Sequence, residues 1–231
     1  MWFDEPRFQK SWANLWAGYV RCANCLGIRG VEGSCPACGT VLSEPDPIVL
    51  TDSEGREYRG PLRAFLGAEG RYEDWVYLMM LEREWKRPLA ETDRFQQIIE
   101  SKRPAARAVI VVVFWSYFET RVERLLREGM HHIPENVRSD LLRRYSSIGS
   151  RLDRLYQILF SNTYFSDLRD LGFSRVASLI QEIQARRNNF AHGSPEAITD
   201  VFVADLVAGL KDEHEAWIAV FNRRAARVHI R

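Results

Sequence analysis

Four cysteines close together constrain this chain more than any other feature of its sequence. Cys22 and Cys25 form one CxxC pair, Cys35 and Cys38 form a second, and the 231 residues contain no other cysteine. Two such pairs allow four thiolates to converge on one soft cation, with each pair on its own tight turn. The spacing therefore predicts a small zinc ribbon with a closed, structural metal site.

Two other uses of these cysteines stay open. Disulfides need an oxidising compartment, and the first residues, MWFDEPRFQK, lack the apolar segment of a secretory signal. Iron is the second alternative, because the stretch CPACG resembles a rubredoxin knuckle. Gly27 and Gly39 follow the two pairs, and we expect them to relieve crowding where backbone amides turn toward the sulfurs. The ribbon is expected to staple the fold or to dock a partner.

The rest of the sequence predicts a mainly α-helical protein. Hydrophobic residues make up 46% of the chain and aromatic residues 12%, which is enough to form a core. We divide the chain into a zinc ribbon with a short β-hairpin (residues 1–62), a connecting helix (63–91) and a helical bundle (92–231). The hairpin is predicted from PIVLT and REYRG, which flank the turn sequence DSEG.

The stretch from Pro104 to Gly129 is the hardest to interpret, because it begins with the β-branched run AVIVVV. A buried strand fits that run, but the apolar residues that follow recur with helical spacing. We predict one long buried helix, with Pro104 in its first turn and Gly129 at its end. Further helices are predicted over residues 91–102, 136–160, 166–190 and 197–227, with Ser194 and Pro195 starting the last.

The charge pattern excludes a generic polyanion binder. The formal net charge is +1, although lysine occurs at only four positions, so that 28 of the 32 basic residues are arginine. Arginine fits phosphate well, and a GC-rich genome would give the same bias. The longest apolar run, AVIVVVFW, is far shorter than the ~20 residues of a membrane span. We expect a cytoplasmic protein that does not cross a membrane.

One short motif, RRNNFAHG (residues 186–193), combines strong cations, amides and an imidazole. Arg187 stands five residues before His192, but this spacing alone carries no information in a chain so rich in arginine. The same spacing joins Arg127 to His132, and it also joins two residues of the C-terminal tail, Arg224 and His229.

The context of Arg187 separates it from the other two pairs. Asn188 follows it directly, and Asn188 and His192 are four residues apart, so they share a helix face. Gly193 is expected to end the helix, which leaves His192 at a C-terminus, where the helix dipole favours the protonated imidazole. An imidazole beside a fixed guanidinium suits acid–base chemistry on a phosphodiester.

The sequence RNNFAHG, closing the penultimate long helix of an all-α unit, resembles the RNxxxH motif of the HEPN superfamily. The resemblance covers residues 92–231 and not the ribbon. It implies that Arg187 stabilises the phosphate, that His192 transfers protons and that Asn188 orients or assists. It also suggests Glu119 as a polar residue on an early core helix, and Arg186 as an extra contact to RNA.

The resemblance further implies a metal-independent endoribonuclease that works as a homodimer, with one motif from each protomer facing a shared cleft. Such a protein is expected to act as a toxin or an antiviral defence effector, with an antitoxin or another defence-system protein as its partner. The alternative is a non-catalytic HEPN-like protein that binds RNA or serves as a scaffold, with the zinc ribbon docking a partner.

Overall fold

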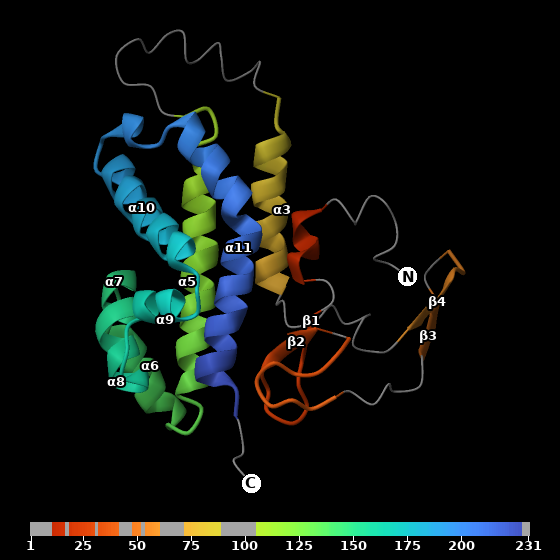
Figure 1. Cartoon of the computed structure of the whole chain (residues 1–231). Helices are drawn as coiled ribbons and strands as arrows, with labels where there is room; N and C mark the ends of the chain where they lie inside the picture. The colour runs from red at the N-terminus through yellow and green to blue at the C-terminus, as the bar shows by residue number, and fades with distance from the viewer. Residues whose placement is uncertain are drawn as a thin grey trace. The chain divides into compact units, whose positions relative to one another are not determined.

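The computed structural model describes residues 11–16, 19–30, 32–41, 48–51, 54–60, 72–88 and 105–227 (Figure 1). The chain divides into two compact units. The ribbon unit comprises Met1–Met79 together with Phe221–Arg231, and the helical unit comprises Met80–Val220. The boundaries predicted at residues 62 and 91, and the helix predicted over 91–102, lie outside the described residues.

The β structure lies entirely in the ribbon unit, within the described part of the chain. It consists of two antiparallel pairs, β1 (Tyr19–Arg21) with β2 (Ile28–Gly30), and β3 (Ile48–Thr51) with β4 (Glu57–Gly60). The second pair is the predicted hairpin, with Ile48 opposite Gly60, and it is confirmed. A 3₁₀ helix, η2 (Trp12–Trp16), precedes β1. The helix α3 (Tyr72–Lys86) contains the boundary between the two units, which lies after Met79.

The helical unit is built around α5 (Val109–Gly129), so the prediction of a helix ending at Gly129 is confirmed and the strand alternative is wrong. Its predicted start, Pro104, lies outside the described residues. Packing overrides the β propensity of the run AVIVVV, because the buried side chains recur every three or four residues, as helix packing requires. They include Ile110, Val111, Phe114, Phe118, Val122 and Leu125. No helix in the described ranges is both long enough and apolar enough to span a bilayer.

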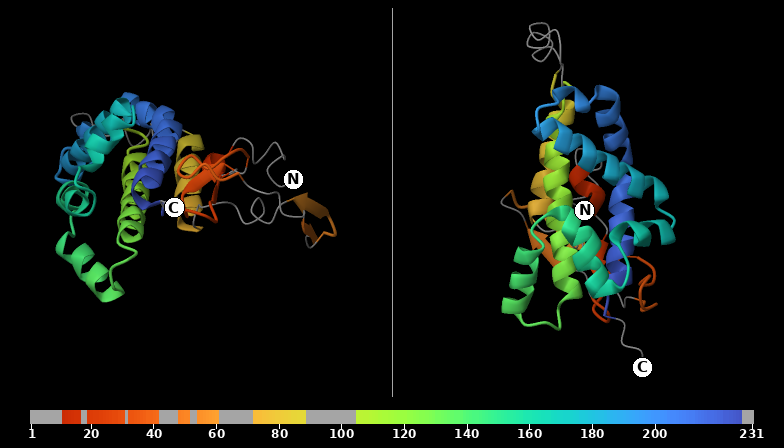
Figure 2. Two further views of the ribbon diagram at one scale, coloured as in Figure 1. Left: turned by 60° about the horizontal axis from the view of Figure 1, so that its bottom comes forward. Right: turned by 90° about the vertical axis from the view of Figure 1, so that its left-hand side faces the viewer.

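The C-terminal helix α11 (Asp200–Ala225) runs parallel to α5 over the part that belongs to the helical unit, which ends at Val220. Hydrogen bonds join the N-terminal ends of the two helices. The Ala105 amide donates to the Ile198 carbonyl over 2.9 Å, and the Ala106 amide donates to the Asp200 carboxylate over 3.0 Å. Further along, Arg121 of α5 pairs with Glu213 of α11. Figures 1 and 2 show these helices side by side and α10 (Ser174–Ala191) running in the opposite direction.

The prediction of one continuous helix over residues 136–160 is wrong. The chain forms α6 (Glu135–Arg144) and then, after a break, α7 (Ile148–Ser150), the π-helical turn η3 (Arg151–Leu155) and α8 (Tyr156–Phe160). The break follows from Ser147, whose hydroxyl accepts from the Ser150 amide over 3.2 Å and so caps a new helix.

The helix predicted over residues 166–190 is likewise two helices, α9 (Tyr164–Asp170) and α10, because the chain turns at Gly172. The last helix starts later than predicted. Pro195–Ala197 form a separate 3₁₀ turn, η4, and the Ser194 side chain makes no capping bond. The Thr199 hydroxyl accepts from the Phe202 amide over 3.3 Å instead, so Thr199 caps α11.

Candidate functional site

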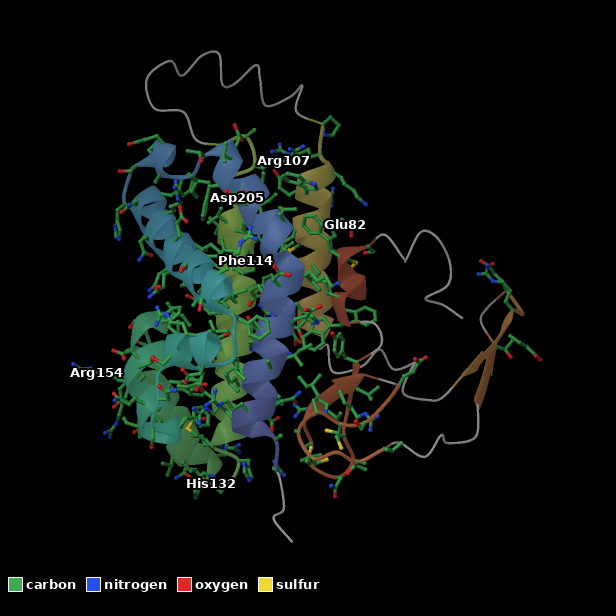
Figure 3. All side chains as sticks on the ribbon, viewed as in Figure 1. Glu82, Arg107, Phe114, His132, Arg154 and Asp205 are labelled. Atoms are coloured by element: carbon green, nitrogen blue, oxygen red, sulfur yellow. The ribbon has the colours of Figure 1, made fainter. Side chains whose placement is uncertain are left out.

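Both cysteine pairs lie on turns with the same hydrogen bonds. In each turn the carbonyl of the first cysteine accepts from the amide four residues on, and its own amide donates to the carbonyl five residues on. The distances are 2.8 and 2.8 Å for Cys22 with Leu26 and Gly27, and 2.8 and 2.9 Å for Cys35 with Gly39 and Thr40. The repeated turn aims two sulfurs from each pair at one point, where the sulfur atoms gather in Figure 3.

The spacing of the sulfurs fits a tetrahedral metal site. All four Sγ atoms lie within 4.8 Å of one another, with 3.7 Å between Cys22 and Cys38 and 3.6 Å between Cys25 and Cys35. A disulfide needs about 2.05 Å, and all four cysteines are free thiols here, so the disulfide alternative is wrong for this structure. Metal–sulfur bonds of about 2.3 Å in tetrahedral geometry place the sulfurs about 3.8 Å apart. The four cysteines can therefore bind one metal ion.

The pKa values of two of these thiols are shifted in opposite directions. Burial raises the pKa of Cys25 to about 12, whereas hydrogen bonds with the Thr40 side chain and backbone lower the pKa of Cys38 to about 5. Because a metal binds thiolates, loading the site must release protons at neutral pH. Metal affinity should therefore fall as the pH falls.

A buried cation accompanies the cysteines. The Arg29 side chain is only 1% exposed and donates to the carbonyls of Gly30 and Thr40 over 3.0 and 2.8 Å, and also to that of Gly33. No carboxylate in the described part of the chain pairs with it. A buried charge is costly without a counter-charge. Three backbone carbonyls on the turns of the ribbon therefore hold this guanidinium in place.

The Gly27 amide donates to the Cys25 sulfur over 3.4 Å, as predicted for an amide that turns toward the cysteines. In the second turn Gly39 has φ +72°, but the equivalent residue of the first turn is Leu26, at φ +58°, and not Gly27. Gly27 is also closely packed. A Cβ atom there would lie 3.0 Å from the Asn222 side-chain oxygen and 3.1 Å from the Ala226 Cβ. The end of α11 thus lies directly against the first cysteine turn.

The motif at residues 186–193 lies at the end of α10, as predicted. The helix ends at Ala191, His192 is its C-cap residue, and Gly193 follows with φ +94°. The His192 amide donates to the Asn188 carbonyl over 3.0 Å, which completes the last turn. The His192 side chain is exposed, so its imidazole is open to a ligand.

The two adjacent arginines have different surroundings. Arg186 donates to Glu182 and to the Ala197 carbonyl over 2.8 Å each, and its guanidinium carbon lies 4.5 Å from the centre of the Phe202 ring. Arg187 contacts only the side-chain oxygen of Asn188, at 3.1 Å, and no carboxylate among the described residues pairs with it. Arg187 therefore keeps a free guanidinium that Asn188 orients, whereas Arg186 holds the chain after the motif.

A groove of about 250 Å³ lies between α10 and α11 on the side of Arg186. Its floor is partly apolar, and three carboxylates line it, those of Glu182, Asp205 and Asp212, against the single cation of Arg175. This charge repels phosphate. A polyanion that reaches the motif is therefore expected on the side of Arg187 and not in this groove.

Glu119 does not join the motif in this structure. It lies half-buried on α5, and within the described ranges no hydrogen bond or ion pair links it to Arg187, Asn188 or His192. The acidic residue that α5 and α11 bury together is Glu213. Its two carboxylate oxygens each lie 2.5 Å from the Arg121 guanidinium, which also covers the Tyr117 ring at 4.0 Å.

Sequence reasoning missed the pair of Arg121 and Glu213. A signal for it exists, since each residue interrupts the apolar stripe of its helix. It also missed Asn222, for which the sequence carries no signal.

The chain matches no family model, no curated protein and no solved structure. Its candidate function therefore follows from the geometry of its own residues.

Proposed function

We propose that this protein is an endoribonuclease that cleaves RNA without a metal ion at the chemical step. The observation that carries the proposal is that the last two turns of α10 and its C-cap hold both Arg187, which pairs with no carboxylate among the described residues, and His192, whose imidazole is exposed. An unpaired guanidinium is ready to bind phosphate through its planar fork. Arg186, the other arginine of the motif, is by contrast paired with Glu182.

The proposed reaction is attack of a ribose 2′-oxygen on the adjacent phosphorus. A base takes the 2′-hydroxyl proton, the new P–O bond forms, and the bond to the 5′-oxygen breaks while an acid protonates the leaving oxygen. The products are a 2′,3′-cyclic phosphate and a 5′-hydroxyl. His192 supplies proton transfer, which typically contributes 10²–10⁴-fold in rate. Arg187 stabilises the charge of the pentacoordinate phosphate.

The base and the acid are two different imidazoles in this proposal, and one copy of the motif offers only one. We therefore propose a two-fold homodimer in which the α10 ends of both protomers face a common cleft. The exposure of His192 supports this, as does the absence of a described carboxylate paired with Arg187, because such an end remains available to a second copy.

For the cysteine site we propose zinc in a structural role. Four thiolates leave no open position for water or substrate, so the ion stabilises the fold and takes no part in cleavage. Elemental analysis of freshly purified protein should find about one zinc per chain. Iron in its place would colour the protein and would overturn the choice of zinc, while leaving the metal site intact.

We propose a cytoplasmic toxin or antiviral defence effector as the biological role, with a partner protein that restrains cleavage. Expression in a bacterial host should arrest growth if no partner is present. A growth arrest that survives the loss of His192 would point to the non-catalytic alternative, in which the protein binds RNA or a partner as a scaffold.

The direct test is to incubate the purified protein with total RNA and to map the cut ends. The reaction is run without added Mg²⁺, with EDTA at a concentration that leaves the cysteine-bound ion in place. We expect 2′,3′-cyclic phosphate ends, and we expect DNA to resist because it has no 2′-hydroxyl. Cut ends that carry a 5′-phosphate would contradict this mechanism.

A further inference from the structure

The end of α11 belongs to the ribbon unit and touches the first cysteine turn. The backbone amide of Arg227 donates to the Cys25 carbonyl over 2.5 Å, and Ala226 packs against the cluster of buried cysteines. The Arg21 guanidinium donates to the Leu26 carbonyl over 2.5 Å. It also lies 4.5 Å from the centre of the Phe221 ring. The first cysteine turn is thus held by residues from both ends of the sequence.

Asn222 makes the most specific of these contacts. Its side-chain oxygen accepts from the Ile28 amide and its side-chain nitrogen donates to the Ile28 carbonyl, each over 2.6 Å. Ile28 begins β2, whose neighbour in the sheet is β1. A carboxamide that binds the amide and the carbonyl of one residue replaces the hydrogen bonds of a neighbouring strand. Asn222 therefore fills the place of a third strand beside the cysteine turn.

We propose that Asn222 is a positioning residue of the metal site, and that metal binding and ordering of the chain end at residues 221–227 are one equilibrium. The inference rests on the proposed metal site but not on ribonuclease activity. Metal binding organises the first cysteine turn, and only the organised turn presents Ile28 and Cys25 in the register that the helix end requires. By linkage, a contact that forms only in the loaded state raises metal affinity, and metal loss frees the contact.

The consequence is a metal-dependent C-terminus. When the ion leaves, by chelation or by oxidation of the thiols, the Asn222 side chain loses its partner strand and Arg227 loses the Cys25 carbonyl. The last turn of α11 then exchanges its amides with solvent. The earlier part of the helix keeps its own packing within the helical unit, in which Phe202, Leu206 and Leu210 are buried.

The first test measures metal affinity of the full-length protein by competition with a chromogenic zinc chelator. Asn222→Ala should weaken zinc binding by about 10–100-fold, the range found when a group that supports a metal ligand is removed. Alanine is the better helix former, so helix propensity alone predicts no loss. Asn136→Ala, on an exposed face of α6, is the matched control and should bind zinc like the wild type.

The second test disrupts the contact of Asn222 by a change in the cysteine turn. Gly27→Ala keeps Asn222 but places a methyl group 3.0 Å from its side-chain oxygen, and it should also weaken zinc binding. Hydrogen–deuterium exchange of the wild type should speed up at residues 221–227 on chelation and stay slow at 202–212. The inference is wrong if the zinc affinity of Asn222→Ala lies within about two-fold of the wild-type affinity. It is also wrong if the exchange rate at residues 221–227 does not change when the metal is removed. If the wild type itself holds no metal, the metal site is wrong instead.

Discussion

The ends of α5 and α10 carry the same pattern, an arginine five residues before a histidine, but they place it in opposite surroundings. At the end of α5, Arg127 donates to Glu123 and to Glu135 over 3.0 Å each, and these bonds, led by the one to Glu123, raise its pKa. At the end of α10, the one polar contact of Arg187 within the described ranges is the neutral side-chain oxygen of Asn188. One guanidinium is neutralised by two carboxylates, and the other stays available to an outside anion.

The glycines at the two helix ends also differ in how closely they are packed. Gly129 is the last residue of α5, and a Cβ atom there would lie 2.4 Å from the Phe160 ring, so this helix end is covered by packing. Gly193 follows α10 and has no atom within 4 Å of a Cβ atom built there. The end of α5 is thus a structural joint, whereas the end of α10 is open. The spacing of arginine and histidine cannot distinguish them, but their partners do.

The sharpest test of this comparison replaces each histidine in turn. His192→Ala should lower RNA cleavage by about 10²–10⁴-fold, because the site loses the imidazole that transfers protons. His132→Ala should cleave at the wild-type rate. Cleavage is measured with a fluorescent RNA, and circular dichroism checks that both variants are folded.

An equal loss of activity in both variants would remove the distinction between the two helix ends. A His192→Ala protein that cleaves at the wild-type rate would show that the proposed mechanism is wrong. Both outcomes are readable because each histidine side chain is exposed, so that neither substitution leaves a cavity.

The next largest effect is expected from the arginines. Arg187→Ala should lower cleavage by about 10²–10³-fold, the usual effect of losing one group that stabilises the transition-state charge, with stability unchanged. Arg127→Ala should do the reverse and leave cleavage intact. It should lower the free energy of unfolding by about 1 kcal/mol or less, because both ion pairs are at the surface. Loss of cleavage in Arg127→Ala, with its fold intact, would contradict the assignment.

The cluster of four cysteines could be predicted almost completely from sequence. Two CxxC pairs specify their own turns, so local spacing alone brings the four sulfurs together. The contact with the end of α11 could not be predicted, because Asn222 lies 194 residues from its partner Ile28. An asparagine near a helix end is common, and only the fold shows which backbone it meets.

The helical unit was predictable in its type but not in its breaks. The long apolar periodicity of α5 and α11 specifies buried helices, and it survives the β-branched run at the start of α5. The breaks at Ser147 and Gly172 depend on single capping or turning residues, which periodicity over a long window averages out. The motif was found from its spacing and context, but the freedom of Arg187 required the positions of every nearby carboxylate.

A smaller effect separates the two glycines. Gly129→Ala forces the new methyl group against the Phe160 ring, and it should lower the free energy of unfolding by about 1–3 kcal/mol. Gly193→Ala meets no atom, but its φ of +94° disfavours a side chain, so it should cost about 1 kcal/mol. Urea unfolding followed by circular dichroism measures both. A larger loss in Gly193→Ala than in Gly129→Ala would mean that the end of α10 is as firmly packed as the end of α5.

The smallest effect is the pH dependence of the end of α5. Hydrogen bonding to Ser139, together with Arg138 and Arg127, lowers the pKa of Glu135 below its ordinary value of 4.5. A carboxylate with a lowered pKa contributes stability above its ordinary pKa, and the contribution is lost as the pH falls through the lowered value. Glu135→Gln should therefore be slightly less stable than the wild type at pH 6, and the two should converge as the pH is lowered toward 3. Thermal unfolding across this range measures the difference. A difference in stability that stays constant with pH would mean that Glu135 acts through packing and not through its charge. The contrast with the end of α10, where Arg187 pairs with no described carboxylate, would then rest on Glu123 alone.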